Sequence, residues 1–355
     1  MELNSSKKNI LITPLNWGLG HATRCIPIII ALLHNNYTPI IASDGHALVL
    51  LKKEFPTLLA LELPSYQIEY SKKGRNLKWN LLRNVFKTIK AIKKEKKIID
   101  KWIKQYNINA LISDNRLGVY SNEIPSVYIT HQLNVLSGNS TWFTSKIHQK
   151  IIRKHTECWI PDFEENPNLT GKLGHLSRTD LKLNYIGPLS RLQKRNVEIK
   201  YDLMIVLSGP EPQRGLLEEK LKTEAQNYSG QVVFVKGIVQ KDQITEQVEN
   251  LTYYNFMNSS QLEQAFNESE IILSRSGYTT IMDVAKLEKK VFFIPTPGQC
   301  EQEYLAKKLN EDYNIPFSTQ KDFNIENIQK AARITGYLKN NYNLDWPKLF
   351  EVFEK

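Results

Sequence analysis

Residues 270–308 read EIILSRSGYTTIMDVAKLEKKVFFIPTPGQCEQEYLAKK, and this stretch decides the fold. A short apolar run at 271–273 predicts a buried parallel strand, and the apolar residues of 281–287 follow a helical spacing. A second apolar run, at 291–294, ends at a proline, and another helix is predicted from about Gln299. The order strand, loop, helix, strand, loop, helix places both loops at the carboxyl edge of a parallel sheet, where open α/β folds bind ligands.

The first of these two loops contains the sequence SRSG and leads directly into a helix. Free backbone N–H groups at the start of that helix, near Ser276 and Gly277, suit a phosphate. Asp283 lies about two turns into the helix, where its carboxylate could accept a hydrogen bond from a ribose hydroxyl. The simpler alternative is an ordinary edge of an α/β sheet with no ligand.

The composition is that of a globular protein long enough for two domains. The chain has 355 residues, of which 41% are hydrophobic and 24% charged. Its three cysteines lie far apart and indicate neither a zinc site nor a disulfide framework, so we expect no metal and a reducing, cytoplasmic location. No segment approaches the roughly 20 apolar residues of a membrane span, and the N-terminal apolar run is too short for a signal peptide.

The net charge of +10 is concentrated in one predicted element. Residues 72–104 contain thirteen lysines and arginines against only Glu95 and Asp100, so this stretch accounts for all of the excess. A long helix is predicted over 77–106, with apolar residues about four apart and a wide apolar stripe. It is either a core helix with a solvated basic face or a contact with an anionic membrane surface. Because the basicity is local, we do not expect nucleic acid as a partner.

A second strand–glycine–helix unit opens the chain. The apolar run at 9–13 predicts a strand, and the loop that follows contains Gly18 and Gly20, which let the backbone approach a ligand closely. His21 then lies at the start of the next helix. Its side chain could act in catalysis, or it could be a helix N-cap that faces water. A strand at 109–113 ends at Asp114, and a short helix is predicted after it, so Asp114 could equally be a helix cap.

A third such unit begins after a predicted hinge near Gly187. The apolar run at 202–207 is followed by Ser208-Gly209-Pro210 and a helix, which repeats the arrangement at the start of the chain. The chain is therefore predicted to be an α/β protein made of two similar halves. We expect domains at 1–187 and 188–335, and a C-terminal helix within 336–355.

Two motifs resemble the donor-binding region of the GT-B glycosyltransferases of family 28, whose members include a peptidoglycan N-acetylglucosaminyltransferase. RSGYTTIMD at 275–283 is similar to that family's RSG-x-x-T-x-x-E segment, and PTPGQCEQEY at 295–304 is similar to a segment that ends in Q-Q-Y. This chain has Asp283 in place of the family's Glu, and Glu303 in place of its second Gln, which leaves the bound sugar open. The sequence GLGHATR at 18–24 is similar to the first loop of many GT-B transferases.

The resemblance implies a GT-B fold, in which two Rossmann-like domains face each other across a cleft and the final helix returns to the first domain. It makes the first domain the acceptor-binding one and the second the nucleotide-sugar-binding one. It also implies His21 as the catalytic base, oriented by Asp114, with Gly18, Gly20, Arg24 and Gln132 in the loops on the phosphate and acceptor side. The donor-binding residues that it implies are Ser208, Gly209, Phe256, Met257, Arg275, Ser276, Gly277, Thr279, Thr280, Asp283, Gln302 and Glu303.

The implied reaction is an inverting transfer of a sugar from a UDP-sugar, with UDP-N-acetylglucosamine as the first candidate, to an unidentified acceptor that could be lipid-linked. It needs no cofactor or metal, since helix N-termini can stabilise the departing diphosphate. The first alternative is a nucleotide-sugar hydrolase of the same fold, in which His21 activates water. A non-enzymatic binding protein with a basic surface is ranked last, because it leaves the glycine loops unexplained. We expect a cytoplasmic protein that contacts the inner face of the membrane.

Overall fold

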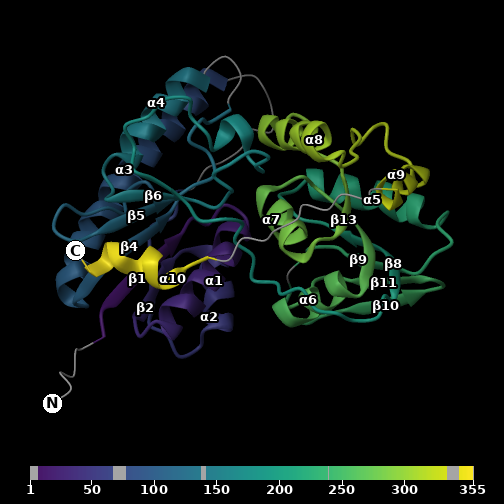
Figure 1. The fold of residues 1–355 in the computed structure, drawn as a ribbon, viewed down its shortest axis with the longest axis horizontal. Helices are drawn as coiled ribbons and strands as arrows, with labels where there is room; N and C mark the ends of the chain where they lie inside the picture. Colours follow the sequence, from purple (N-terminus) through teal and green to yellow (C-terminus); the bar gives the residue numbers. More distant parts are fainter. Residues whose placement is uncertain (1–6, 67–76, 137–140, 239, 334–343, 355) are drawn as a thin grey trace.

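The computed structural model describes residues 7–66, 77–136, 141–238, 240–333 and 344–354, and for 77–87 it describes the backbone only. A seven-stranded parallel sheet with the order β3-β2-β1-β4-β5-β6-β7 forms the N-terminal half (Figure 1). Its strands are β1 (Asn9–Pro14), β2 (Thr38–Ser43), β3 (Ala60–Glu62), β4 (Ile108–Asp114), β5 (Ser126–Ile129), β6 (Glu157–Ile160) and β7 (Leu183–Tyr185). The helices of this half are α1 (Gly20–His34), α2 (Gly45–Glu54), α3 (Leu77–Gln105) and α4 (Thr141–Ile152).

A six-stranded sheet with the order β10-β11-β9-β8-β12-β13 forms the C-terminal half. Its strands are β8 (Tyr201–Val206), β9 (Val232–Val235), β10 (Thr245–Val248), β11 (Leu251–Tyr254), β12 (Ser269–Ser274) and β13 (Lys290–Phe293). Its helices are α5 (Gln213–Ala225), α6 (Ser259–Asn267), α7 (Tyr278–Leu287), α8 (Cys300–Tyr313) and α9 (Ile328–Ala332). All pairs are parallel except β10–β11.

The central strands of both sheets are buried because they are apolar at almost every position, as expected of parallel strands covered on both faces. One hydrophobic cluster continues from the N-terminal sheet through α1 and α7 into the C-terminal half. The two halves therefore touch along α1 and α7 (Figure 1). The N-terminal sheet ends with β7 and the C-terminal sheet begins with β8, and Gly187 lies in the segment that joins them.

The end of the chain returns to the N-terminal half. Helix α10 (Trp346–Phe350) continues into a 3₁₀ turn at Glu351–Glu354. Phe353 packs edge-on against Tyr37 and lies 5.9 Å, between ring centroids, from Trp159. Lys8 also pairs with Glu354. Of the predicted C-terminal segment, 336–343 lies outside the described residues, as does most of the loop predicted before α3.

Four features differ from the sequence-based expectations. The short helix predicted after Asp114 is wrong, because 115–125 form irregular turns. Asn115 has a positive φ of 57°, and the side chain of Arg116 is buried and bound to Asp44 and Glu95. Gly118 lets this segment approach α3 so closely that a Cβ there would lie 2.5 Å from the Ile92 carbonyl oxygen. Strand β10 and helices α4 and α6 were not predicted, and β10 is exposed throughout, so hydrophobicity gave no signal for it.

Candidate active site

The loop between β1 and α1 brings the two halves together. Gly18 takes a positive φ of 72°, and the chain then turns into α1 at Gly20. A Cβ at Gly20 would lie 2.6 Å from the hydroxyl of Thr279, near the start of α7. Glycine is therefore required there for the N-terminal ends of α1 and α7 to meet. Two of the three glycine-containing loops noted in the sequence, one from each half, therefore lead into helices that meet.

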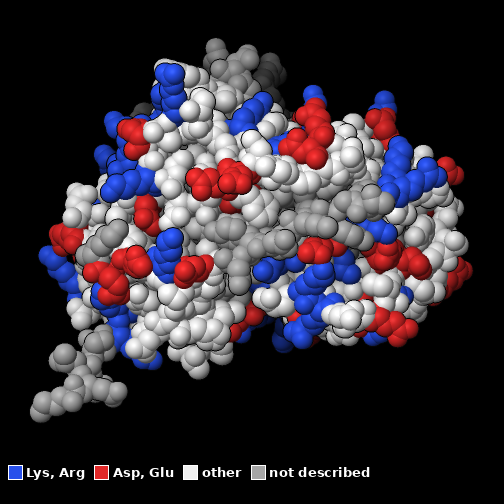
Figure 2. Space-filling model, in the orientation of Figure 1, with Lys and Arg blue, Asp and Glu red and all other residues white. Residues whose placement is uncertain are grey.

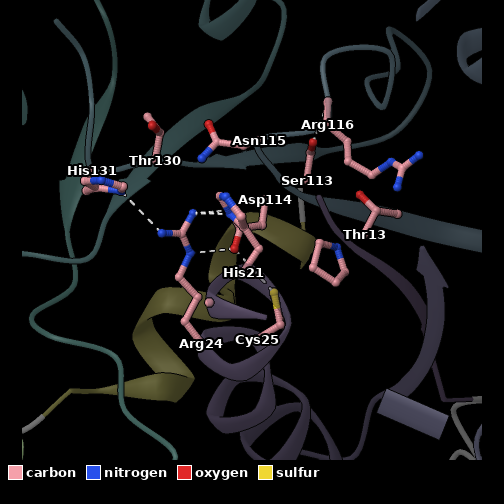
Figure 3. A network of polar contacts seen from close by, with 12 residues as sticks. Thr13, His21, Arg24, Cys25, Ser113, Asp114, Asn115, Arg116, Thr130 and His131 are labelled. Atoms are coloured by element: carbon pink, nitrogen blue, oxygen red, sulfur yellow. Dashed lines mark hydrogen bonds and ion pairs between the residues drawn. The ribbon is translucent and has the colours of Figure 1, made fainter. Parts of the chain in front are cut away.

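His21 and Asp114 are brought together at this junction. His21 Nδ1 lies 2.9 Å from Asp114 Oδ1, at the end of β4 (Figure 3). Asp114 is fully buried, and 13% of the His21 side chain is exposed. When Nδ1 donates to the carboxylate, Nε2 is left unprotonated and has no hydrogen-bond partner among the described residues. Two alternatives from the sequence are wrong: Leu19 is the N-cap of α1, so His21 is not, and no helix follows Asp114 for it to cap.

Arg24 belongs to the same cluster. Its side chain is 2% exposed, its Nε donates to Asp114 Oδ2 at 2.6 Å, and its Nη2 donates to Asp114 Oδ1. Nη2 also lies 2.8 Å from His21 Nδ1 (Figure 3), because both nitrogens donate to Asp114 Oδ1; this contact is not itself a hydrogen bond. His21 and Arg24 are three residues apart on α1 and so share one helix face. Its place on the phosphate and acceptor side stays a prediction, and the contact that the structure shows is with Asp114.

The buried charges favour an uncharged His21. Burial lowers the pKa of His21, Asp114 opposes that effect, and Arg24 reinforces it. Burial acts to raise the pKa of Asp114, but Arg24 and then His21 hold it well below its usual range. Asp114 therefore stays ionised, Arg24 balances its charge, and His21 is neutral near pH 7. A neutral imidazole with a free Nε2 is the form that a general base requires.

A second histidine links this cluster to the C-terminal half. His131, two residues after β5, is 7% exposed, and its ring stacks on Tyr278 at 4.3 Å between centroids. Its Nε2 lies 2.8 Å from Glu301 Oε1 in the first turn of α8. Burial acts to raise the pKa of Glu301, but His131 holds it below its usual value. Gln132, predicted on the acceptor side, lies beside the same contact, with its amide nitrogen 3.3 Å from His131 Nε2.

The loop after β12 contains the RSG motif. Gly277 is the N-cap of α7, and no side chain caps that helix start. The buried Ser276 hydroxyl donates to the carbonyl oxygen of Gln302. Arg275 is 2% exposed and donates to the carbonyl groups of Ile294, Pro295 and Gln213 and to the Gln320 side chain, while burial lowers its pKa to about 10. The Arg275 guanidinium thus holds neighbouring loops together, and donor binding by Arg275 stays a prediction.

The residues predicted to contact the sugar and the ribose have internal partners. Gln302 Oε1 accepts from the backbone N–H of Thr296, and Glu303 Oε1 accepts from that of Gly298. Both side chains thus fix the loop between β13 and α8. Asp283 Oδ1 accepts from the Ser190 hydroxyl at 2.5 Å, and burial raises the pKa of Asp283 to about 6.

The remaining predicted donor-site residues lie in loops at the carboxyl ends of strands. Ser208 and Gly209 follow β8 and are exposed, and Gly209 has a positive φ of 103°. Phe256 and Met257 follow β11 and are partly buried. Thr279 and Thr280 lie in the first turn of α7. These residues thus lie in, or directly after, three loops at one edge of the C-terminal sheet, the edge at which α/β folds bind ligands.

No group of three or more His, Cys, Asp and Glu side chains in the described part of the chain is arranged to hold a metal ion. Sequence reasoning assigned no role to His131, Tyr278 or Glu301. His131 and Glu301 are 170 residues apart, and the sequence offered no signal for their pairing. Glu301 stands next to the motif residue Gln302 in the first turn of α8. The packing of the two halves determines which side chain of that turn faces the N-terminal half, and the sequence does not show this packing.

Comparison with known proteins identifies the C-terminal half. Residues 213–340 match the glycosyltransferase family 28 C-terminal domain. Two curated relatives are named UDP-N-acetylglucosamine–N-acetylmuramyl-(pentapeptide) pyrophosphoryl-undecaprenol N-acetylglucosamine transferase. The Haemophilus ducreyi protein is 20% identical over 207 residues, 56% of this chain and 55% of that protein. The Sulfurihydrogenibium sp. protein is 23% identical over 274 residues, 76% of this chain and 72% of that protein. The chain thus spans about half the length of the first relative.

Solved structures show the same fold along the whole chain. MurG of Acinetobacter baumannii superposes with a TM-score of 0.59 at 13% identity, covering 98% of this chain and 99% of that one. The calicheamicin glycosyltransferase CalG4 gives a TM-score of 0.62 at 10% identity, covering 98% and 94%. The predicted GT-B fold is thereby confirmed. The chain therefore has the GT-B fold along its length, and its residues 213–340 are similar to the family 28 C-terminal domain.

Proposed function

We propose that this protein transfers a sugar from a UDP-sugar to an acceptor hydroxyl, with inversion at the anomeric carbon and with His21 as the general base. The observation that carries the proposal is the pair formed by His21 and the buried Asp114, placed where the starts of α1 and α7 meet. A neutral imidazole, oriented through Nδ1 and free at Nε2, can accept a proton from a hydroxyl group.

The chemistry is a single displacement. His21 Nε2 takes the proton of the acceptor hydroxyl while its oxygen forms a bond to the anomeric carbon of the sugar. The bond between that carbon and the diphosphate oxygen breaks, and UDP departs with the electron pair. Attack opposite the leaving group inverts the configuration. The lowered pKa of His21 keeps the base unprotonated near neutral pH, so it is ready to act without a prior proton loss.

The donor is proposed to lie at the carboxyl edge of the C-terminal sheet. The uncapped start of α7 offers N–H groups and a helix dipole to the diphosphate, which can replace a metal ion in stabilising the leaving group. Asp283 is the candidate for the ribose, and the segment Phe256–Met257 for the uracil ring. Since the curated relatives are named for UDP-N-acetylglucosamine, we propose that nucleotide sugar as the donor.

We further propose that the acceptor is lipid-linked and that the N-terminal half contacts an anionic membrane surface, as expected of a cytoplasmic protein at the inner face. None of the helices in the described residues has the length and apolar character needed to cross a bilayer. On α4, Trp142, Phe143 and Ile147 are all exposed. Lys96 of α3 and Lys154 just after α4 both lie over the ring of Tyr120, so the two helices share one surface.

Lysines and arginines gather on this surface (Figure 2). The exposed lysines of α3 among the described side chains are Lys90, Lys93, Lys94, Lys97, Lys101 and Lys104. Glu95 is buried in its pair with Arg116 and does not offset their charge. Glutamine at Lys93, Lys94, Lys96 and Lys97 should lower binding to anionic vesicles and leave UDP binding unchanged. If the unchanged protein binds vesicles equally well with and without anionic lipid, or at low and high salt, the proposed membrane contact is contradicted.

The reaction itself is tested by turnover of UDP-N-acetylglucosamine labelled in the sugar, with and without a cell lipid extract, in the presence of EDTA. A transferase should move label into the lipid fraction and release free sugar slowly when no acceptor is present. Rapid release of free sugar by the purified protein alone would instead establish a nucleotide-sugar hydrolase. Dependence of transfer on added divalent metal would contradict the role proposed for the helix start.

A further inference from the structure

The ring of His131 is held by two helices of the opposite half. It stacks on Tyr278 of α7, with an angle of 9° between the rings, and its Nε2 contacts Glu301 of α8. Tyr278 in turn donates through its hydroxyl to the carbonyl oxygen of Pro161, which lies in the N-terminal half. His131 therefore lies at a contact between the two halves, next to the His21 cluster.

The contacts of His131 determine which of its nitrogens carries the proton. Arg24 Nη1 lies 3.3 Å from His131 Nδ1 (Figure 3), and a guanidinium group can only donate. Nδ1 therefore accepts from Arg24 while Nε2 donates to Glu301, so both contacts favour the tautomer with the proton on Nε2. The Gln132 amide nitrogen, 3.3 Å from Nε2, donates to the same Glu301 carboxylate. The other donors of Arg24 are directed to Asp114. A continuous set of contacts thus runs from Glu301 through His131 and Arg24 to the carboxylate that orients His21.

We propose that His131 is a positioning residue, which holds Arg24 against Asp114 and thereby orients His21, and that Glu301 reinforces the required His131 tautomer when the two halves are in contact. The inference rests on the proposed function in one respect, because its effect on turnover passes through His21. Its consequence is that contact with the donor-binding half completes the orientation of the base. Glu301 and Tyr278, both in the C-terminal half, supply the hydrogen bond and the ring contact that hold the His131 side chain.

The tautomer can be measured without any substrate. Imidazole nitrogen NMR of the ¹⁵N-labelled full chain resolves the protonated and unprotonated nitrogens of its seven histidines, and the signals missing from His131→Asn identify His131. We expect the Nε2–H form in the unchanged protein and in Glu301→Gln, which keeps an acceptor oxygen. Glu301→Ala should weaken that preference, because only the contact with Arg24 then favours it. A predominant Nδ1–H form in the unchanged protein, or no change in Glu301→Ala, would overturn the proposal.

Tyr313→Phe is the matched control for Glu301→Ala. The Tyr313 hydroxyl also joins α8 to the N-terminal half, donating to the carbonyl oxygen of Pro167 at 2.8 Å, but it does not touch His131. If any loosening of the two halves altered the tautomer, this variant would alter it too. We expect it to keep the Nε2–H form. Loss of that form in Tyr313→Phe as large as in Glu301→Ala would contradict a specific role for Glu301.

Three substitutions of His131 separate positioning from packing. Phenylalanine keeps the stacking on Tyr278 but removes both polar contacts, and it should lower kcat by about 10–100-fold while the KM for UDP-sugar stays within about twofold. Asparagine can place an acceptor near the Nδ1 position and should restore more activity than glutamine, which reaches toward Glu301. Full activity of His131→Phe would reduce His131 to a packing residue. If no UDP-sugar is turned over at all, the proposed function fails, while the tautomer measurement still decides the structural part.

Discussion

Replacing Arg24 with glutamine should move the acid side of the pH–rate profile to higher pH. Arg24 Nη2 lies 2.8 Å from His21 Nδ1, and the same guanidinium balances the charge of Asp114. After burial, whose effect is largest, Arg24 helps to lower the pKa of His21, and Asp114 opposes both. Without the guanidinium, Asp114 carries an unbalanced negative charge beside the imidazole. The protonated form of His21, which cannot act as a base, is then favoured.

The size of the effect follows from the geometry. Two unit charges about 4 Å apart interact by about 4 kcal/mol at an effective dielectric constant of about 20. Water that enters the space left by the shorter side chain reduces this, so we expect about 1.4–2.8 kcal/mol. That energy corresponds to a 10–100-fold loss of neutral His21 on the acid side of the profile. Arg24→Gln should therefore lose about 10–100-fold in kcat/KM near pH 6 and regain most of it toward about pH 9.

The assay is the pH dependence of kcat/KM for the free enzyme, measured with the labelled UDP-sugar and the acceptor extract. Arg24→Lys is the matched control: it keeps the positive charge but not the paired hydrogen bonds, and its acid side should stay close to that of the unchanged protein. Thermal unfolding at each pH establishes that the variants are folded. An activity loss in Arg24→Gln that is equal at every pH would refute the electrostatic reasoning and leave only a structural effect.

Three further substitutions test other contacts. Gly20→Ala places a methyl group against the Thr279 hydroxyl and should destabilise the fold by about 1–3 kcal/mol, and Thr279→Ala in the same chain should restore part of the melting temperature. The raised pKa of Asp283, about 6, means that its stabilising contribution is present below about pH 4 and is lost as the pH rises to about 6. Asp283→Asn, whose amide oxygen can still accept from Ser190, should therefore raise the free energy of unfolding at pH 7 by about 1–3 kcal/mol in denaturant titrations; an unchanged value would contradict this. Arg275→Met leaves buried carbonyl groups without donors and should lower stability by about 2–4 kcal/mol, whereas weakened UDP binding with unchanged stability would return Arg275 to the donor site.

The parts of the site that the sequence predicted are those that depend on local order along the chain. Apolar runs followed by glycines located the loops before α1 and α7, because buried parallel strands and the turns after them have local signatures. The resemblance to family 28 then paired His21 with Asp114, which periodicity alone could not do. The three-residue spacing places Arg24 on the same helix face as His21. The spacing does not predict that Arg24 is buried and directed to Asp114.

What the sequence could not supply depends on packing between distant segments. The irregular segment after Asp114 is held by Arg116, whose buried partners Asp44 and Glu95 lie far away in the chain. A short helix was predicted there although Gly118, within the segment, disfavours one. The pairing of His131 with Glu301 likewise exists only once the two sheets have formed and α8 has docked. Side chains that join two domains leave no periodic pattern in either one.

The most direct test of the central claim compares transfer and donor binding in the unchanged protein and in His21→Ala. Loss of a general base costs about 10²–10⁴-fold in the rate of the chemical step and should leave ground-state binding almost unchanged. Single-turnover transfer of labelled sugar to the acceptor extract should therefore fall by that factor in His21→Ala, while calorimetry gives the same affinity for UDP in both proteins. Transfer by His21→Ala at the rate of the unchanged protein would contradict the claim that His21 is the base.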